Sequence, residues 1–525
     1  MKMKVLLITG LLAKDIVEQY ARKSGVKTTV LALNVSVAAF LTPKKIAEEL
    51  RSLNLEGYDV ILVPGLVRGN VKLVEDVTGI PTYKGPKYAA DIPTVLNFLG
   101  KVKLSKEVPA CEILKGEIQH WALEELADAE KRRNLLLKNP GNITVGGLAI
   151  GKDFPMRVMA EIVDVPLLSD EEIEAMARQY VRDGADIIDV GMLVDEPRPL
   201  DARRAVIAVK RAVNVPVSID TLNPDEAREA VSAGCDIVLS ADAGNMREMA
   251  SFASKVAVVV IPTNHKERYF PKEAEKRVEF LERNIKEAKK LGIEKVIGDL
   301  ILDSVNSPGI TESLIAYQTF AKRNPEVPLL MGVGNVTELI DADSVGVNAL
   351  LAGIASEIGV SILLTTEKSA KARGSIKELS TASKMMFLAK KKSSVPKDLG
   401  LDLLILKDKR RTEEPYNASL ENELPVIKTE KDVKPPVLDP KGCFKIMVDR
   451  QNEFIVALYF PTFNRDKPSL IIKGKRAEEI YSKIIEMNLI ARLDHAAYLG
   501  SELTKAEIAL KIGKNYVQDN PLFSF

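Results

Sequence analysis

Carboxylate and amide side chains recur through the middle of the chain, at the ends of short apolar runs. Eight positions could form a site together: Asp164, Asp189, Asp220, Ser240, Asp242, Asn264, Asp299 and Asn335. Carboxylates accept hydrogen bonds, whereas amides both donate and accept them, so such a ring can bind a flat heterocycle that presents N–H groups beside a carbonyl. A buried site of this kind discriminates strongly, because a wrong ligand leaves polar groups without partners.

The same residue types also have a structural interpretation. Carboxylates just after a strand often cap the N-terminus of the next helix, and Asp170 and Asp225 are candidates for that role alone. A single aspartate does not separate the two interpretations, but the repetition of acids and amides after successive strands favours a binding site. We therefore predict a polar, mostly acidic site with few cations.

Eight short apolar runs must position these residues. The runs are 157–162, 186–190, 215–219, 236–239, 256–261, 295–301, 328–332 and 360–364. Helical patterns separate them, for example at 170–183 and 224–233. Eight strand–helix units in about 250 residues predict a (β/α)8 TIM barrel over residues 142–394, with its functional face at the C-terminal ends of the strands. An open doubly wound sheet is the alternative.

The N-terminal residues 1–141 form a second region of α/β pattern. Apolar β-rich runs at 4–9, 28–33 and 58–64 alternate with helices, which predicts a parallel sheet of Rossmann or flavodoxin type. Gly10, Gly65 and Gly69 lie just past strand ends, but no dinucleotide or phosphate-loop motif accompanies them, so structural turns are favoured. A charged helical connector is expected at 108–137.

Two segments follow the barrel. Residues 395–440 combine prolines with mixed charge and lose the periodicity, which predicts a linker. Residues 441–525 predict a small α+β domain with strands at 443–448 and 453–459 and helices at 476–488 and 502–511.

The overall charge excludes several classes of partner. The chain has 74 basic and 73 acidic residues, which gives no electrostatic case for nucleic acid or a membrane. No apolar run approaches the ~18–20 residues of a membrane span. The three cysteines are far apart and lack metal-ligand spacing, so we expect reduced thiols, a cytoplasmic protein and no metal site. The flanking domains could serve as interfaces in a homo-oligomer.

Several motifs in the predicted barrel are similar to those of dihydropteroate synthases. GADIIDVG at 184–191, followed by PRP at 197–199, resembles their second-strand signature. VPVSIDT at 215–221 and NPDEAREAVSAGCDIVLS at 223–240 resemble their third and fourth strands. The resemblance implies that a reduced pterin binds here, with its pyrimidine edge held by Asp220 and Asp299. Ser240 stands where that family usually has Asn.

The chain departs from the synthases where they bind pyrophosphate. Gly334-Asn335-Val336 replaces their basic Ser-Arg-Lys run, and Leu364-Thr365-Thr366 replaces their Arg-x-His. Displacement of pyrophosphate without cations loses the charge stabilisation that the reaction needs. His265, Lys266 and Arg268, after the fifth strand, could partly substitute for them.

Other motifs resemble pterin-dependent methyltransferases of the same superfamily. MGVGNV at 331–336 is similar to their Gly-x-Ser-Asn motif, with Asn335 on the Asn, and AEIVD at 160–164 places Asp164 on the Asn of their first-strand motif. That chemistry needs a hydrogen bond or proton at the pterin N5, and Asn335, Asp164 and Asp189 are the candidates to supply it. Asp220, Ser240, Asp242, Asn264, Asp299 and Asn335 are the expected pterin-binding residues.

The resemblance therefore favours methyl transfer from a tetrahydromethanopterin-type or folate-type pterin, with a corrinoid on a partner protein or flanking domain as acceptor. Synthase-like C–N bond formation in methanopterin biosynthesis is the first alternative, and a non-catalytic pterin-binding or docking subunit is the second. The segment 493–519 resembles a small archaeal domain sometimes found with methanopterin-dependent methyltransferase components. Its Asp494-His495 pair does not match the spacing of a corrinoid-binding motif, which favours a structural histidine.

Overall fold

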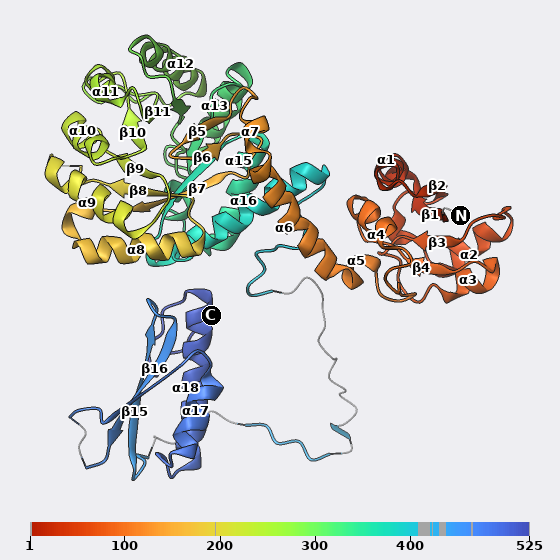
Figure 1. Ribbon diagram of the computed structural model, residues 1–525. Coiled ribbons are helices and arrows are strands. Elements are labelled where there is room, and N and C mark those ends of the chain that lie inside the picture. Colours follow the sequence, from red (N-terminus) through yellow and green to blue (C-terminus); the bar gives the residue numbers. More distant parts are fainter. Residues whose placement is uncertain are drawn as a thin grey trace. The chain divides into compact units, whose positions relative to one another are not determined.

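The computed structural model describes residues 3–194, 196–407, 421–422, 424–429, 437–463 and 466–523 (Figure 1). The chain divides into two compact units, Met1–Leu403 and Leu404–Phe525. The division falls inside the linker predicted at 395–440, and part of that linker lies outside the described residues. No helix among the described residues is long and apolar enough to cross a membrane.

The middle of the first unit is an eight-stranded parallel barrel, as the eight apolar runs predict. Its strands are β7 (Arg157–Ile162), β8 (Ile187–Gly191), β9 (Val217–Asp220), β10 (Ile237–Ala241), β11 (Ala257–Val260), β12 (Val296–Gly298), β13 (Leu330–Gly332) and β14 (Ile362–Thr366). They pair in the order β12-β11-β10-β9-β8-β7-β14-β13. A parallel bridge between Gly298 and Leu329, with the Gly298 amide donating to Pro328 at 2.9 Å, joins the two ends. The open doubly wound sheet is therefore excluded.

A ring of helices surrounds the strands (Figure 1). These helices are α8 (Asp170–Asp183), α9 (Pro199–Ala212), α10 (Pro224–Ser232), α11 (Met246–Ala253), α12 (Ala274–Lys290), α13 (Ile310–Arg323), α15 (Ser344–Ile358) and α16 (Ser375–Lys392), with a short α14 (Gly334–Thr337) after β13. Ser169 caps α8 and Asn223 caps α10 through side-chain bonds to backbone amides. Asp170 and Asp225 are therefore not the caps but lie in the first turn, where acidic groups interact favourably with the helix dipole.

A small hairpin covers the end of the barrel at which the strands begin. β5 (Ile143–Val145) and β6 (Leu148–Ile150) are antiparallel, and Val145 and Ile150 share a buried core with residues of the barrel strands. A side chain at Gly146 would collide with Asp236 and Pro216, which precede β10 and β9. The hairpin thus covers the N-terminal ends of the strands and leaves the C-terminal ends for a site. The sequence patterns did not predict it.

The N-terminal region is a parallel sheet with helices on both faces, as predicted. β1 (Lys4–Gly10), β2 (Lys27–Leu33), β3 (Val60–Val63) and β4 (Thr82–Lys84) run in the order β2-β1-β3-β4. α1 (Lys14–Ala21) and α4 (Ile92–Phe98) contribute to one core cluster, while α2 (Pro43–Arg51) and α3 (Lys72–Thr78) contribute to the other. Gly65 turns the chain where a Cβ would collide with the backbone of Gly85 and Pro86.

The predicted helical connector joins this sheet to the barrel. It consists of α5 (Ala110–Ile113), α6 (Lys115–Lys131) and α7 (Arg133–Leu136). Lys392, at the end of α16, forms a buried ion pair with Asp91 at 3.0 Å, and its ammonium lies 4.0 Å from the ring centre of Trp121. The Tyr20 hydroxyl donates to the carbonyl of Ser393 at 3.1 Å. These contacts fix the last barrel helix to the N-terminal region.

The second unit contains a small α+β domain. β15 (Gly442–Asp449), β16 (Phe454–Pro461) and β17 (Leu470–Gly474) form an antiparallel sheet that packs on α17 (Ala477–Glu486) and α18 (Leu493–Ile512). β17 was not predicted, and α18 begins earlier than expected. Asp439 explains the earlier start, because its carboxylate accepts the amides of Ala491 and Arg492 just before the helix. His495 also contacts Asp439, at 3.1 Å, which agrees with a structural role.

Candidate functional site

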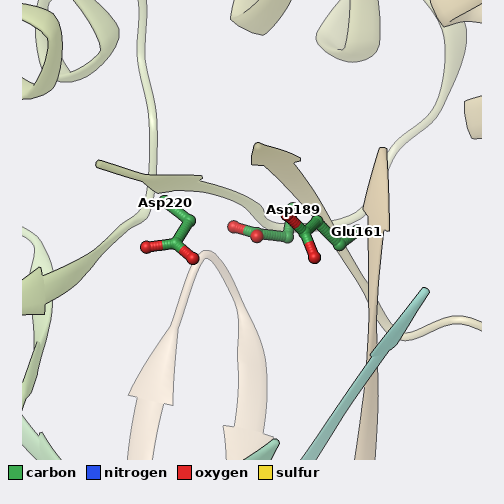
Figure 2. Close-up of side chains that lie close together, drawn as sticks. All are labelled: Glu161, Asp189 and Asp220. Atoms are coloured by element: carbon green, nitrogen blue, oxygen red, sulfur yellow. The ribbon is translucent and has the colours of Figure 1, made fainter. Parts of the chain in front are cut away.

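Three carboxylates meet at the ends of three neighbouring barrel strands. Glu161 lies on β7, Asp189 on β8 and Asp220 at the end of β9. One oxygen from each lies within 4.8 Å of the others, and Figure 2 shows that the three side chains lie close together. Glu161 pairs with Asp189 in the strand register, so both side chains point to the same face of the sheet. The sequence predicted Asp189 and Asp220 for the site but missed Glu161.

Gly191 makes room for the Glu161 carboxylate. Gly191 pairs with Asp220 in the register of β8 and β9. A Cβ at this position would collide with Oε1 of Glu161 and would approach the carbonyl oxygen of Ile162 to 3.2 Å. The absence of a side chain in the GADIIDVG motif therefore lets Glu161 reach the two aspartates.

Serine hydroxyls orient both aspartates. Ser218 donates to Oδ1 of Asp189 at 2.5 Å, and Ser240 donates to Oδ1 of Asp220 at 2.6 Å. Asp189 is fully buried, yet its Oδ2 has no hydrogen-bond partner among the described residues. Buried polar atoms are almost always hydrogen-bonded, so this oxygen marks a position for a ligand atom or a proton.

Asp299 is oriented in the same way just after β12. Its Oδ1 accepts the Tyr317 hydroxyl and the amide of Ile301, the latter at 2.8 Å. Ile301 has φ 63° and Ser240 has φ 66°, both in the left-handed region. A β-branched residue rarely adopts this conformation, and such strain clusters at functional sites. The backbone is therefore strained beside both aspartates that the resemblance assigned to the pterin edge.

Burial and mutual repulsion raise the pKa values of these acids. Burial, together with the charge of Asp220, raises the pKa of Glu161 to about 7. Burial also raises the pKa of Asp299 to about 6 and that of Asp189 well above its usual range. The pKa of Asp220 is raised by burial as well, although Ser240 opposes the change. The site therefore favours cations, protons or N–H donors and repels anions.

The cations beside the site are already paired. Arg277 is buried, and its guanidinium bonds Asp303 at 2.5 Å and the carbonyl oxygen of Ile301 at 2.8 Å. Lys368 forms an ion pair with Asp164 at 2.9 Å. These cations fix the loops of the barrel mouth rather than project into the acidic cluster.

Asp242 and His265 form a separate network in the loops after β10 and β11. Both oxygens of the buried Asp242 accept hydrogen bonds from this loop region, including the amide of Gly244 and the amide of His265. The His265 ring lies 2.8 Å from Asp242. Lys266, which could partly substitute for a pyrophosphate-binding cation, pairs with Glu248 at 2.7 Å.

The remaining predicted site residues lie around the mouth. Asn264 forms a backbone bridge with Tyr269 and shapes the same loop. Asn335, exposed on α14, donates to the carbonyl oxygen of Leu302 at 2.9 Å. Asp164 lies close enough for its charge to raise the pKa of Glu161. The catalytic roles of Asn335 and Asp164, and the pterin contacts of Asp242 and Asn264, stay predictions.

Three protein families match separate parts of the chain. The family described as "Pterin binding enzyme" matches residues 164–362. The "Family of unknown function (DUF6513)" matches residues 3–87, and "PterinBD-DUF4346" matches residues 438–519. Each match falls within one of the structural regions described above.

One curated relative matches over its whole length. The "Uncharacterized protein MJ0107" of Methanocaldococcus jannaschii is 47% identical over 534 residues, which cover 99% of this chain and 99% of that protein. A "Ycf91-like protein" of Nostoc sp. is 34% identical over 106 residues, 16% of this chain and 84% of that protein.

The solved structures that match include dihydropteroate synthases. The enzyme of Stenotrophomonas maltophilia with bound imidazole is 22% identical, with a TM-score of 0.38 and coverage of 46% of this chain and 94% of that chain. The enzyme of Yersinia pestis in a sulfonamide complex is 16% identical, with a TM-score of 0.39 and coverage of 48% and 99%. The chain belongs to the same family as the Methanocaldococcus jannaschii protein, and its barrel belongs to the pterin-binding superfamily that includes the dihydropteroate synthases.

Proposed function

We propose that the barrel binds a reduced pterin at its C-terminal mouth and transfers a methyl group from it to an acceptor. The observation that carries this proposal is the acidity of the site: Glu161, Asp189 and Asp220 lie close together, and the neighbouring cations Arg277 and Lys368 are paired with other acids. The substrate is a tetrahydromethanopterin-type pterin, a choice supported by the archaeal source of the full-length relative.

Asp220 and Asp299 are the residues that would hold the pyrimidine edge. The edge carries a ring N–H and an amino group, which a carboxylate can accept as charge-assisted hydrogen bonds. Each aspartate has Oδ1 fixed by a hydroxyl group, from Ser240 or Tyr317. Such fixed orientation lowers the entropy that binding costs, because the carboxylate is already in place.

The same charge favours methyl transfer over displacement of pyrophosphate. In methyl transfer the bond between N5 and the methyl carbon breaks, its electron pair stays on N5, and the carbon bonds to the nucleophilic acceptor. No anionic leaving group has to be stabilised, provided that N5 receives a proton or a strong hydrogen bond. Asn335, Asp164 and Asp189 remain the candidates for that contact. A reduced corrinoid, on a partner protein or a flanking domain, supplies the nucleophile.

A direct assay separates this function from its rivals. The full chain is incubated with methyl-tetrahydromethanopterin and cob(I)alamin, and methylcobalamin is followed by absorbance. We expect methylcobalamin with the native chain and a strong decrease with Asp299→Asn, whereas Asp341→Asn, which removes an exposed carboxylate 97% accessible in its side chain, serves as the control. Release of pyrophosphate from a dihydropterin pyrophosphate and an arylamine, without methyl transfer, would establish the synthase reaction instead. Tight pterin binding without turnover of either kind would establish a non-catalytic subunit.

A further inference from the structure

We propose that Glu161, Asp189 and Asp220 bind a hard divalent cation, of the Mg²⁺, Mn²⁺ or Ca²⁺ class, at the ends of β7, β8 and β9. Carboxylate oxygens are the ligands that these cations prefer. The proposal concerns the barrel itself and does not require methyl transfer. It adds a metal site where the sequence offered no metal-ligand motif.

The spacing of the three carboxylates suits one shared ion. One oxygen from each lies within 4.8 Å of the others (Figure 2). Three oxygens spaced evenly around one ion are about 4.0–4.5 Å apart for Ca²⁺ and about 3.5–3.6 Å apart for Mg²⁺. The cluster therefore accepts Ca²⁺ with little movement, and the smaller cations after a modest contraction of the side chains.

The unpartnered oxygen of Asp189 is an independent observation that points to a ligand. Asp189 is 0% exposed, and Ser218 fixes its Oδ1 at 2.5 Å. Among the described residues, nothing donates a hydrogen bond to its Oδ2. Leaving a buried acceptor unpaired is unfavourable, and more so for a charged group. A bound cation satisfies this oxygen together with one oxygen from each neighbour.

Charge balance supports the same conclusion. Two partly buried acids of the barrel have a basic partner: Asp303 pairs with Arg277 at 2.5 Å, and Asp186 lies 3.8 Å from Arg157. Within the described part of the chain, no lysine or arginine forms an ion pair with Glu161, Asp189 or Asp220. Buried charges are normally paired or coordinate metals.

The cation and the pterin can share Asp220. An ionised carboxylate offers about four lone-pair positions on two oxygens, and Ser240 takes one of them on Oδ1. A cation on one position leaves others for the N–H donors of a ring. Asp299 is not among the three clustered carboxylates, which separates its role from cation binding.

The test is a titration of the chelator-treated full chain with Mn²⁺. Binding is measured by calorimetry and by the decrease of the electron paramagnetic resonance signal of free Mn²⁺. We expect one saturable site per chain, with Mg²⁺ or Ca²⁺ as competitor. Asp189→Asn preserves the size of the side chain and should weaken Mn²⁺ binding at least about 10-fold. Asp341→Asn removes an exposed carboxylate and should leave the affinity unchanged.

Gly191→Ala distinguishes coordination from general attraction of cations by negative charge. The new Cβ displaces the Glu161 carboxylate but removes no charge. Coordination predicts weaker Mn²⁺ binding in this variant by at least about 10-fold, with thermal unfolding measured alongside to verify the fold. Absence of a saturable site in the native chain, or an affinity that both variants leave unchanged, would overturn the proposal.

A crossed measurement separates failure of this proposal from failure of the proposed function. Asp299→Asn should lose pterin affinity but retain the Mn²⁺ site, because Asp299 is not one of the ligands. A native chain that binds Mn²⁺ but no reduced pterin would refute the proposed function alone. Pterin binding without any Mn²⁺ site would refute the cation alone.

Discussion

Replacement of Asp299 by asparagine is expected to stabilise the barrel at neutral pH while it weakens pterin binding. Burial raises the pKa of Asp299 from its ordinary 3.8 to about 6. The folded chain therefore holds this proton more tightly than the unfolded chain, so stability falls as the pH rises from about 4 to 6 and stays lower above that range. The raised pKa therefore lowers the free energy of unfolding by about 3 kcal/mol at pH 7.5.

The asparagine variant lacks this titration. Its Oδ1 can still accept from Tyr317 and from the Ile301 amide, so the local structure is preserved. The stability of the variant relative to the native chain should increase by about 1–3 kcal/mol between pH 4.5 and pH 7.5. Its pterin affinity should fall about 10- to 150-fold, because one charged hydrogen-bond acceptor contributes about 1.5–3 kcal/mol.

Two measurements check this prediction. Urea unfolding at pH 4.5 and pH 7.5, followed by the fluorescence of the single tryptophan, Trp121, gives the pH dependence of stability. Calorimetry with a reduced pterin gives the affinity, and Tyr317→Phe, which removes the orienting hydroxyl but keeps the carboxylate, should show a smaller loss. A variant that is equally destabilised at both pH values and binds pterin normally would refute the reasoning.

Three further predictions concern residues outside the acidic cluster. Lys392→Met leaves the buried Asp91 without its cation and should cost about 3–5 kcal/mol in urea unfolding, most of it restored by Asp91→Asn in the same chain. Burial raises the pKa of Asp439, but backbone N–H groups and His495 outweigh it and hold the pKa at about 2. The ionised Asp439 therefore stabilises the fold fully above about pH 4, and this contribution is lost as the pH falls towards 2. Asp439→Asn should lower the free energy of unfolding by about 1–2 kcal/mol at pH 6, measured by thermal unfolding, and this deficit should vanish near pH 2. Asp242→Asn offers one acceptor oxygen where the loop uses two, so it should cost about 2–3 kcal/mol of stability in urea unfolding. Calorimetry with a reduced pterin tests the predicted pterin contact of Asp242, since a loss of affinity as large as that of Asp299→Asn would demonstrate it and an unchanged affinity would refute it.

The barrel could be predicted from the sequence because its strands are short apolar runs separated by helical patterns. All eight predicted strands are present, and the predicted helix 170–183 is α8. The hairpin β5–β6 was missed, because its two strands have only three residues each and are stabilised by packing against the interior residues of the barrel strands. The start of α18 was misplaced because Asp439, which accepts the amides just before the helix, lies more than fifty residues away in the sequence.

The candidate site was predicted less completely than the fold. Asp189 and Asp220 could be found because they end strands in motifs that resemble a known family. Glu161 was passed over, although it lies in the first strand as Asp189 lies in the second, because the sequence does not show which residues of neighbouring strands pair with each other. Asp242 also follows a strand in the sequence, but in the structure its two oxygens accept hydrogen bonds from backbone amides of the neighbouring loops.

The central claim is that the mouth of this barrel binds a reduced pterin through Asp220 and Asp299. The most direct test is an anaerobic calorimetric titration of the full chain with tetrahydromethanopterin, repeated with Asp220→Asn. The account predicts one pterin per chain and an affinity at least about 10-fold weaker in the variant. Absence of saturable binding by the native chain, or equal affinity for both proteins, would contradict it.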